Sequence, residues 1–523
     1  MKKIHLLLPL IFALLFAYLF RGQQAGVNVL IMDVLVLILL YSTGKINPVN
    51  TTQLILSSGL LVSGFMSLLY GSAMAVFANV ITMILLAGIS ADNELRQLLN
   101  VIPTSFSASA SGFYVYVSQL FNFNTKAGGK RYFTRFLLIV LFPLIIALVF
   151  VMLYAGASPF FNALTGDFIH RLEVWVEQLF KYIDPAYFWL FIAGLLIAAA
   201  FVFGQSGDFL KLINESVPLQ LKRVRRSPAG KPMLLRIEYR SGIVLLILLN
   251  VLIGVMNVLD IWNVWLFFDW NGGYLKQFVH EGTWLLVFSI VISILIVIYY
   301  FRASLNFYPR RKLLLYLAIG WLAQNALLAF SVGMRNWLYI QHFNLAFKRI
   351  WVYAFLFLTL FGIATVMIKI ISRKTNNYLF YYNSIAAYLM IVAMSLVNWD
   401  VVIARHNYKH YTTSFFHTDF LASLDGSALP VLKESTLHIA EIKQVQEQKF
   451  DFAEWYMSLD NYAKHVNNRC QNFLYGYPLL DWQSWNVADY RTYRVLLKEM
   501  KINPYYPADQ DKADTSAVQS KQK

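Results

Sequence analysis

The sequence predicts an all-α, polytopic membrane protein of about 11 transmembrane helices, with a small helical C-terminal extramembrane domain. Three observations support this fold class. Only 14% of the 523 residues are charged, whereas a soluble globular protein carries about a quarter. Hydrophobic residues make up 58% of the chain, and the mean hydropathy is +0.53. Apolar runs of about 20 residues, the length that crosses the hydrocarbon core, recur along most of the sequence.

Each apolar run is expected to be a helix, because the hydrocarbon core offers no hydrogen-bond partners to an open backbone. The runs are too long and too uniformly apolar to be barrel strands. The first run has the basic tip of a signal peptide, but Arg21 follows it instead of a small-residue cleavage site, so an uncleaved span is expected. The expected spans lie near residues 4–20, 25–41, 52–70, 72–90, 136–156, 187–204, 241–263, 282–301, 313–333, 351–371 and 379–397.

The net charge of +16 lies in the segments between the spans. From residue 398 onward, 14 Lys and Arg residues stand against 15 Asp and Glu residues, so the C-terminal part is nearly neutral. Basic loops of membrane proteins usually mark the cytoplasmic side. The charge therefore indicates topology, and no nucleic-acid partner is expected.

Lys and Arg concentrate in alternate loops, above all in 91–135 and 205–240, which predicts that these loops are cytoplasmic. The N-terminus is then cytoplasmic, and an odd number of spans brings the C-terminus outside. We expect a transmembrane bundle over residues 1–397, a helical extracytoplasmic domain over 398–505 and a polar, disordered tail over 506–523. The expected location is the inner (cytoplasmic) membrane.

Five segments in the second half of the chain carry a resemblance to a known family. They are NVLDIW (257–262), VHEGTW (279–284), YIQHFNLAFKRIWVYAFLFLTLFGIATVMIKI (339–370), NWDVVIARHN (398–407) and DWQSWNVADYR (481–491). Over about half of its length the chain resembles bacterial polytopic membrane proteins filed as a domain of unknown function, the DUF4153/DUF4173 group, and is most similar to Bacteroidetes-like members. The resemblance agrees with the expected number of spans and implies no activity or cofactor.

One stretch departs from the pattern that this resemblance implies. Asn344 and Ala346 stand where a Gly-Leu-Thr sequence is expected. If that Gly–Thr pair has a functional role in the family, this chain lacks it. The positions that do match the pattern are Phe343, Leu345, Lys348, Arg349, Lys369, Asn398, Trp399, Asp400 and Asn407.

Three polar side chains are expected at bilayer depth: Asp33 in the second span, and Gln324 and Asn325 in the span near 313–333. Polar groups are costly there, which makes them functional candidates. Asp33 suits a relay of protons or ions. The alternative is an interhelical hydrogen bond, and it is favoured for all three residues.

A second group of polar residues lies at span ends on the predicted outer side. Asp260, His280 and Glu281 occupy facing ends of consecutive spans. Two carboxylates and an imidazole can form acid–base machinery or coordinate a divalent ion. The alternative, which is preferred, is that they anchor the ends of their spans.

Arg335, Lys348 and Arg349 bring positive charge to the same predicted outer side. Their default role is to extend toward lipid phosphates, and the alternative is to bind an anionic head group or glycan. We hypothesise that these basic residues and the preceding acidic ones gather in one region of the outer membrane boundary.

The stretch WDVVIARHNYKHY, which begins at Trp399, marks the exit of the chain from the membrane. His406 and His410 share a helical face and, with a carboxylate, have the ligand types of a zinc site. The favoured alternative is a structural junction. In it Trp399 lies in the interfacial belt, Asp400 and Asn407 cap or cross-link the backbone, and both histidines are solvated. No metal and no cofactor are expected.

Three classes of function are open. The preferred class is a non-enzymatic envelope or signalling component whose C-terminal domain meets a partner. A transporter that uses buried polar residues comes second, because no internal repeat is found. A membrane enzyme acting on lipid or glycan at the outer face comes third, because the common nucleotide-binding and hydrolase motifs are missing. The expected partners are the lipid bilayer, an anionic lipid or head group, and a protein.

Overall fold

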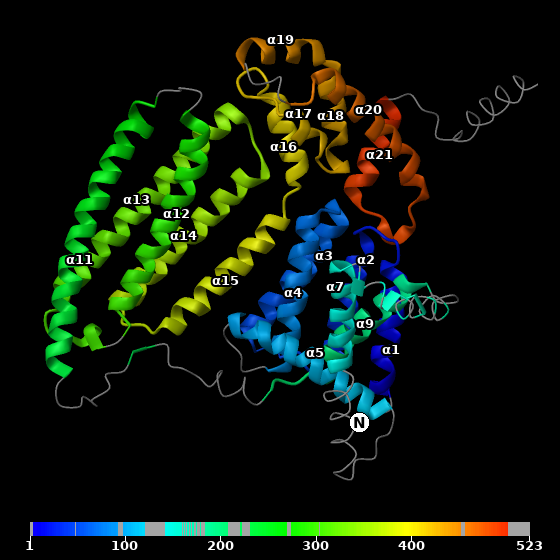
Figure 1. Cartoon of the computed structure of the whole chain (residues 1–523), viewed down its shortest axis with the longest axis horizontal. Coiled ribbons are helices and arrows are strands. Elements are labelled where there is room, and N and C mark those ends of the chain that lie inside the picture. Colours follow the sequence, from blue (N-terminus) through cyan, green and yellow to red (C-terminus); the bar gives the residue numbers. More distant parts are fainter. Residues whose placement is uncertain are drawn as a thin grey trace, which may run out of the picture.

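The computed structural model shows an all-α protein, and the residues that it describes contain no β-strand (Figure 1). Two groups of membrane helices, which we call the first and second lobes, stand beside each other. A helical C-terminal domain lies over one end of the first lobe and beside the same end of the second. The described residues are 4–47, 49–92, 98–120, 142–158, scattered positions from 160 to 178, 184–207, 220–221, 231–268, 274–302, 304–450 and 456–499.

The first lobe packs six helices around one hydrophobic core. Its helices begin where the sequence supplies capping residues. The Asn50 side chain accepts hydrogen bonds from the backbone N–H groups of Thr52 and Gln53, and Asp184 caps the helix that starts at Pro185. The helices of this lobe are α1 (Ile4–Phe20), α2 (Val27–Ser42), α3 (Thr51–Tyr70), α4 (Ala73–Ala91), α5 (Leu98–Leu120) and α9 (Pro185–Phe203), and α7 (Phe142–Ala157) lies between α5 and α9 in the chain.

The helix α5 lies in a segment, 91–135, that the sequence analysis treats as a loop between spans. Ser105 Oγ donates to the Ile84 carbonyl at 2.6 Å, and Ser111 Oγ donates to the Gln205 carbonyl at 3.0 Å. α5 therefore packs against the C-terminal ends of α4 and α9. Its several serines lower its hydropathy, which is why a search for apolar runs misses it.

The second lobe has its own hydrophobic core, formed by four long helices. The helix α13 has 33 residues, a length of about 50 Å. This exceeds the roughly 30 Å of hydrocarbon, so α13 projects beyond the membrane core. The helices of this lobe are α11 (Lys231–Asp260), continued by a π-helical segment (Ile261–Leu266), α12 (Tyr274–Tyr300), α13 (Arg311–Phe343) and α14 (Phe347–Ile371).

The membrane helices confirm the predicted fold class. Seven described helices are long and apolar enough to cross a membrane. Three shorter apolar helices, within α1, α2 and α12, coincide with further expected spans. The helix α7 overlaps the span expected near 136–156. Hydropathy alone therefore locates these elements.

The helix α15 (Asn376–Ser395) packs on both lobes. On one side, Asn383 Nδ2 donates to Thr365 Oγ1 of α14 at 2.9 Å. On the other, the Tyr388 hydroxyl lies 3.2 Å from Thr82 Oγ1 of α4 and against Gly59 of α3. Figure 1 shows α15 running obliquely from the second lobe to the C-terminal domain. This helix is therefore the main connection between the lobes at membrane depth.

The C-terminal domain begins at Asn398 and buries a third hydrophobic core. Ile350 and Ala354 of α14 and Met394 of α15 belong to this same core. The domain is therefore continuous with the membrane helices. Its helices are α16 (Trp399–Lys409), α17 (Thr418–Ala422), α18 (Leu429–Leu437), α19 (Ile439–Lys449), α20 (Leu459–Gly476) and α21 (Val487–Glu499).

The C-terminal domain contacts three corners between consecutive membrane helices. The Val27 N–H donates to the Trp485 carbonyl at 2.9 Å, at the α1–α2 corner. Gly71, between α3 and α4, lies against the Asn486 side chain. The Leu345 N–H, between α13 and α14, donates to Asn407 Oδ1 at 2.9 Å. These corners therefore lie at one end of the molecule. Most of the expected basic loop 205–240 and the expected disordered tail 506–523 lie outside the described residues.

Candidate functional site

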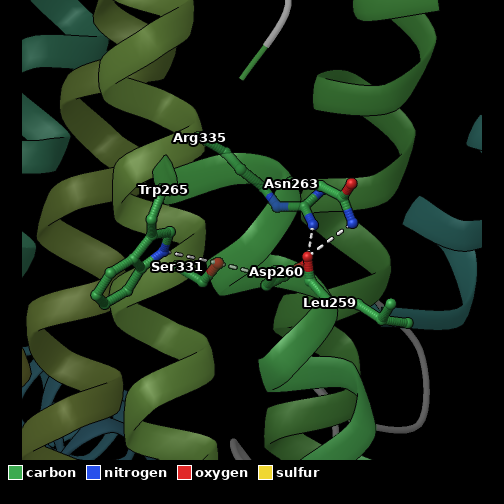
Figure 2. A network of polar contacts seen from close by, with 6 residues as sticks. All are labelled: Leu259, Asp260, Asn263, Trp265, Ser331 and Arg335. Atoms are coloured by element: carbon green, nitrogen blue, oxygen red, sulfur yellow. Dashed lines mark hydrogen bonds and ion pairs between the residues drawn. The ribbon is translucent and has the colours of Figure 1, made fainter. Parts of the chain in front are cut away.

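A buried ion pair links the end of α11 to α13 in the second lobe (Figure 2). Arg335 donates to Asp260 Oδ1, and Ser331 Oγ donates to Asp260 Oδ2 at 2.6 Å. Trp265, in the π-helical segment, donates from Nε1 to Ser331 Oγ at 3.4 Å. The side chains of Asp260 and Arg335 are only 5% and 4% exposed. The sequence predicts that both charged residues lie in one region, and in the structure they form an ion pair.

Ser331 and Trp265 also belong to this network, although the sequence does not predict either of them as a partner of Asp260. Ser331 precedes Arg335 by four residues, so the two share one face of α13. That spacing is the signal by which a serine partner for Asp260 can be sought. Trp265 follows Asp260 through a π-helical segment, a rare geometry that occurs frequently at functional sites. With both carboxylate oxygens accepting hydrogen bonds, Asp260 is arranged as an interhelical lock between α11 and α13.

Arg349 lies beyond this network and caps the end of α13. Its guanidinium donates to the Phe343 carbonyl at 2.7 Å and also to the Asn344 carbonyl, and it lies over the Tyr339 ring. The last carbonyls of a helix have no partner within the helix, so a cation there is stabilising. Lys348 is exposed at the start of α14. The side chains of His280 and Glu281 lie outside the described residues.

Asp33 is fully buried between three helices of the first lobe. Its Oδ2 accepts a hydrogen bond of 2.7 Å from Asn79 Nδ2 of α4, and that amide also donates to Ser63 Oγ of α3. Gly64 leaves room for the carboxyl group, since a Cβ there would overlap it. Among the described atoms, Asp33 Oδ1 has no hydrogen-bond partner. Asp33 therefore acts in an interhelical hydrogen bond and keeps one free acceptor.

Gln324 and Asn250 connect α13 to α11. Gln324 Nε2 donates to Asn250 Oδ1 at 2.8 Å, and Asn250 Nδ2 donates to the Leu317 carbonyl at 3.1 Å. Asn257 Nδ2 donates to the Gln324 carbonyl at 3.1 Å. Asn325 is buried and donates to the Trp321 carbonyl within its own helix. Gln324, Asn250 and Asn257 therefore hold α11 and α13 together, which is the role that the sequence favours for Gln324. Asn325 differs from the same expectation, because its amide bonds within α13.

The junction between the second lobe and the C-terminal domain is built on backbone hydrogen bonds. Asn407 is buried; its Oδ1 accepts from the Leu345 N–H and its Nδ2 donates to the Leu345 carbonyl at 3.0 Å. Trp399 Nε1 donates to the Met394 carbonyl at 2.8 Å. Asp400 Oδ1 accepts from the Asp425 N–H at 2.9 Å. Each of these side chains satisfies backbone groups where the chain leaves the membrane.

The backbone of Asn344 explains why the family resemblance implies glycine at this position. Its φ of 67° and ψ of −175° belong to a region that residues other than glycine rarely adopt. The Asn344 amide holds this conformation through Nδ2 contacts to the carbonyls of Asn407 and Phe415, at 3.3 and 3.4 Å. The departure from glycine is therefore balanced by side-chain hydrogen bonds within the corner.

The two histidines of this stretch differ from the expectation that they are solvated. His406 is half-buried, and its Nδ1 lies 3.1 Å from Asn344 Oδ1. The rings of His406 and His410 are stacked with centroids 4.3 Å apart. Burial lowers the pKa of His406 below its ordinary value of 6.5, and His410 lowers that pKa further. No group of three potential ligands that could hold a metal ion occurs in the part of the chain that was described.

Comparison with known proteins identifies one family. A family model described as "Domain of unknown function (DUF4153)" matches residues 55–435, which run from α3 in the first lobe to α18 in the C-terminal domain. No curated protein and no solved structure matches the chain.

Replacing Asp260 by Ala should lower the free energy of unfolding by about 3–5 kcal/mol, because Arg335 is left buried without its carboxylate. The double variant Asp260→Leu with Arg335→Met should recover most of this loss, since it removes both charges. Unfolding of the purified protein in mixed micelles measures both effects.

The partly exposed pair of Glu238 and Arg302, 3.3 Å apart, is the matched control. Glu238→Ala should lower the free energy of unfolding by less than about 1 kcal/mol. Additive losses at Asp260 and Arg335 would contradict the lock.

The C-terminal domain should lose stability as the pH falls below 6.5, the ordinary pKa of histidine. Because burial lowers the pKa of His406 and that of His417 in the folded state, the unfolded chain binds more protons in this range. Burial raises the pKa of Asp400, which acts in the opposite sense at lower pH. Thermal unfolding followed by tryptophan fluorescence at pH 7.5 and 5.5 measures the effect. His406→Gln should show a smaller difference between the two pH values, and an unchanged difference would exclude His406 as a contributor.

Proposed function

Because this chain belongs to the DUF4153 family, a domain of unknown function, we propose its role from its own geometry: a non-enzymatic envelope or signalling component of the membrane. In this role the C-terminal domain receives a partner and transmits its binding to the two lobes. The chain is a membrane protein built of helical lobes, and its role and its partner are inferred from that structure.

The observation that carries the proposal is the attachment of the C-terminal domain to both lobes. At the first lobe, Gln23 Nε2 donates to Asp481 Oδ2 at 2.8 Å, and the Gln24 N–H donates to Ser484 Oγ at 2.9 Å. At the second lobe, Asn407 bonds both backbone groups of Leu345. A ligand that shifts the domain therefore acts on both lobes at once.

The polar network of the second lobe supports a mechanical role over a catalytic one. Both oxygens of Asp260 are engaged, by Arg335 and Ser331, at the end of α11. A general base must lie within hydrogen-bond reach of a substrate proton, and the Asp260 side chain is only 5% exposed. Arg349 Nη1 likewise donates to two backbone carbonyls at the end of α13. These groups fix helix positions, as a component that transmits force or position requires.

The proposed location is the inner (cytoplasmic) membrane of a bacterium, with the N-terminus in the cytoplasm and the C-terminal domain outside. The excess of Lys and Arg in alternate loops supports this orientation. The corners that the C-terminal domain contacts belong to the poorly basic set of loops. Lys348, exposed at the start of α14 on that side, is placed to contact an anionic head group.

Reporter fusions test the orientation. A fusion after residue 226 should report a cytoplasmic position, and a fusion after residue 430 an extracytoplasmic one, because an odd number of spans separates them. Paired alkaline phosphatase and fluorescent-protein fusions provide opposite readouts for each site. Two fusions that report the same side would show that the number of spans between them is even.

Site-specific photo-crosslinking in the native host tests the partner. Leu437, the last residue of α18, is 74% exposed. The helix that follows it, α19, is the part of the C-terminal domain that Figure 1 shows most distant from the lobes. A photoreactive residue there should give a protein adduct of discrete mass, identified by mass spectrometry. The matched control is Leu248 of α11, which is 63% exposed along the membrane span and should contact lipid.

Crosslinking from the C-terminal domain, combined with lipid analysis, distinguishes the proposed role from an enzymatic one. If Leu437 and the exposed Tyr475 and Tyr490 give no protein adduct, the C-terminal domain has no stable partner. Lipid analysis of a deletion strain should then be decisive. Accumulation of one lipid or glycan precursor would replace the proposed role by an enzyme acting at the outer face, whereas unchanged lipids agree with a non-enzymatic component.

A further inference from the structure

The first lobe contains a cavity of about 270 Å³, and Asn79 of the Asp33 network lies in its wall. Its lining is almost wholly apolar, and five helices contribute to it. The lining residues on α4 recur at every helical turn and follow one face of that helix. They are Val76, Asn79, Val80, Met83, Ile84 and Ala87.

The cavity is elongated along the membrane helices. From Val76 to Ala87 the lining covers eleven residue steps of α4, or about 16 Å. Phe20 and Val29 contribute to the wall at the end near the C-terminal domain, and Ser105 contributes at the opposite end. A narrow space of this length fits a single hydrocarbon chain.

The cavity opens sideways toward the position of the lipid. Two of its lining residues are exposed, Val80 by 49% and Phe106 by 70%, on α4 and α5. The helix α4 is one of the helices long and apolar enough to span the membrane. The opening therefore faces hydrocarbon, and an occupant from the bilayer enters between α4 and α5.

Asn79 supplies one hydrogen-bond acceptor to this apolar space. The residue is 3% exposed, and its Nδ2 donates to Asp33 and Ser63. Its amide oxygen, by contrast, accepts no hydrogen bond from the described residues. The hydroxyls of Ser105 and Ser109, which also line the cavity, donate to backbone carbonyls. Asn79 Oδ1 is thus a buried acceptor that is available to an occupant.

We propose that this cavity is a binding site for one long hydrocarbon chain that carries a hydroxyl or amide donor. The chain lies along α4 between Val80 and Ala87, and its donor bonds Asn79 Oδ1. Asn79 is six residues from Ala73, about 9 Å below the end of α4 that faces the C-terminal domain. One well-placed polar group in an apolar pocket fixes the orientation of a ligand. The site does not depend on the proposed partner of the C-terminal domain.

Photolabelling of the full-length protein in phosphatidylcholine nanodiscs tests the site. The probe is a long-chain alcohol with a diazirine in its chain. Labelling should be saturable, should map to peptides of α4, α5 and α9, and should fall at least tenfold in Ala200→Phe, which fills the cavity. The matched control on the same helix is Leu196→Phe, since Leu196 is exposed to lipid and should leave labelling unchanged.

Competition by unlabelled compounds tests the donor without changing the protein. The free alcohol should compete several-fold better than its methyl ether, because one hydrogen bond contributes a modest net amount. A long-chain amide and a polyprenyl alcohol, tried in parallel, distinguish an acyl from an isoprenoid source. Equal competition by alcohol and ether would remove Asn79 from the site.

Two results would overturn the proposal. The first is labelling that does not saturate and is spread around the lobe, which is the behaviour of lipid that only surrounds the protein. The second is unchanged labelling in Ala200→Phe. If Ala200→Phe does not fold, as judged by its elution profile, the smaller change Ala87→Leu replaces it. The saturation measurement on the unaltered protein decides the question independently of either variant.

Discussion

The architecture depends on one constraint: a polar group among membrane helices has no water to bond, so it must find its partner within the protein, and the most informative partners lie on another helix. Asp260 finds Arg335 and Ser331, Asp33 finds Asn79, and Gln324 finds Asn250. Each of these contacts fixes the position of one helix against another more specifically than apolar packing can. The two lobes are therefore defined by their few polar contacts as much as by their hydrophobic cores.

The sequence predicts most of the membrane helices, because the cost of a span is set by local apolar composition. It also identifies Asp33, Asp260 and Arg335, since polar residues stand out within apolar runs. It does not predict Asn79 or Ser331 as their partners. Such pairs are brought together by packing between helices, and the sequence around either residue does not indicate its partner. The helix α5 escapes prediction because its serines lower its hydropathy, and the sequence does not record that their hydroxyls bond backbone carbonyls in the fold.

The junction at Asn407 shows where local pattern gives way to tertiary structure. The stretch that contains His406 is polar, and polarity alone predicts a solvated surface. The corner at Asn344 changes this, because its positive φ turns the chain so that the Asn344 side chain meets His406. A backbone conformation cannot be read from side-chain polarity. The histidine is therefore half-buried for a reason that lies 62 residues away in the sequence.

The ion pair of α11 and α13 also has a consequence for biosynthesis. Asp260 and Arg335 are separated by 75 residues, so α11 is made before the arginine that neutralises its carboxylate exists. During insertion the carboxylate must stay near the membrane surface or be protonated until α13 arrives. A nascent chain interrupted after α12 therefore exposes an unmatched acidic residue to the bilayer. The same contact that locks the finished lobe therefore leaves an unneutralised charge in an unfinished one.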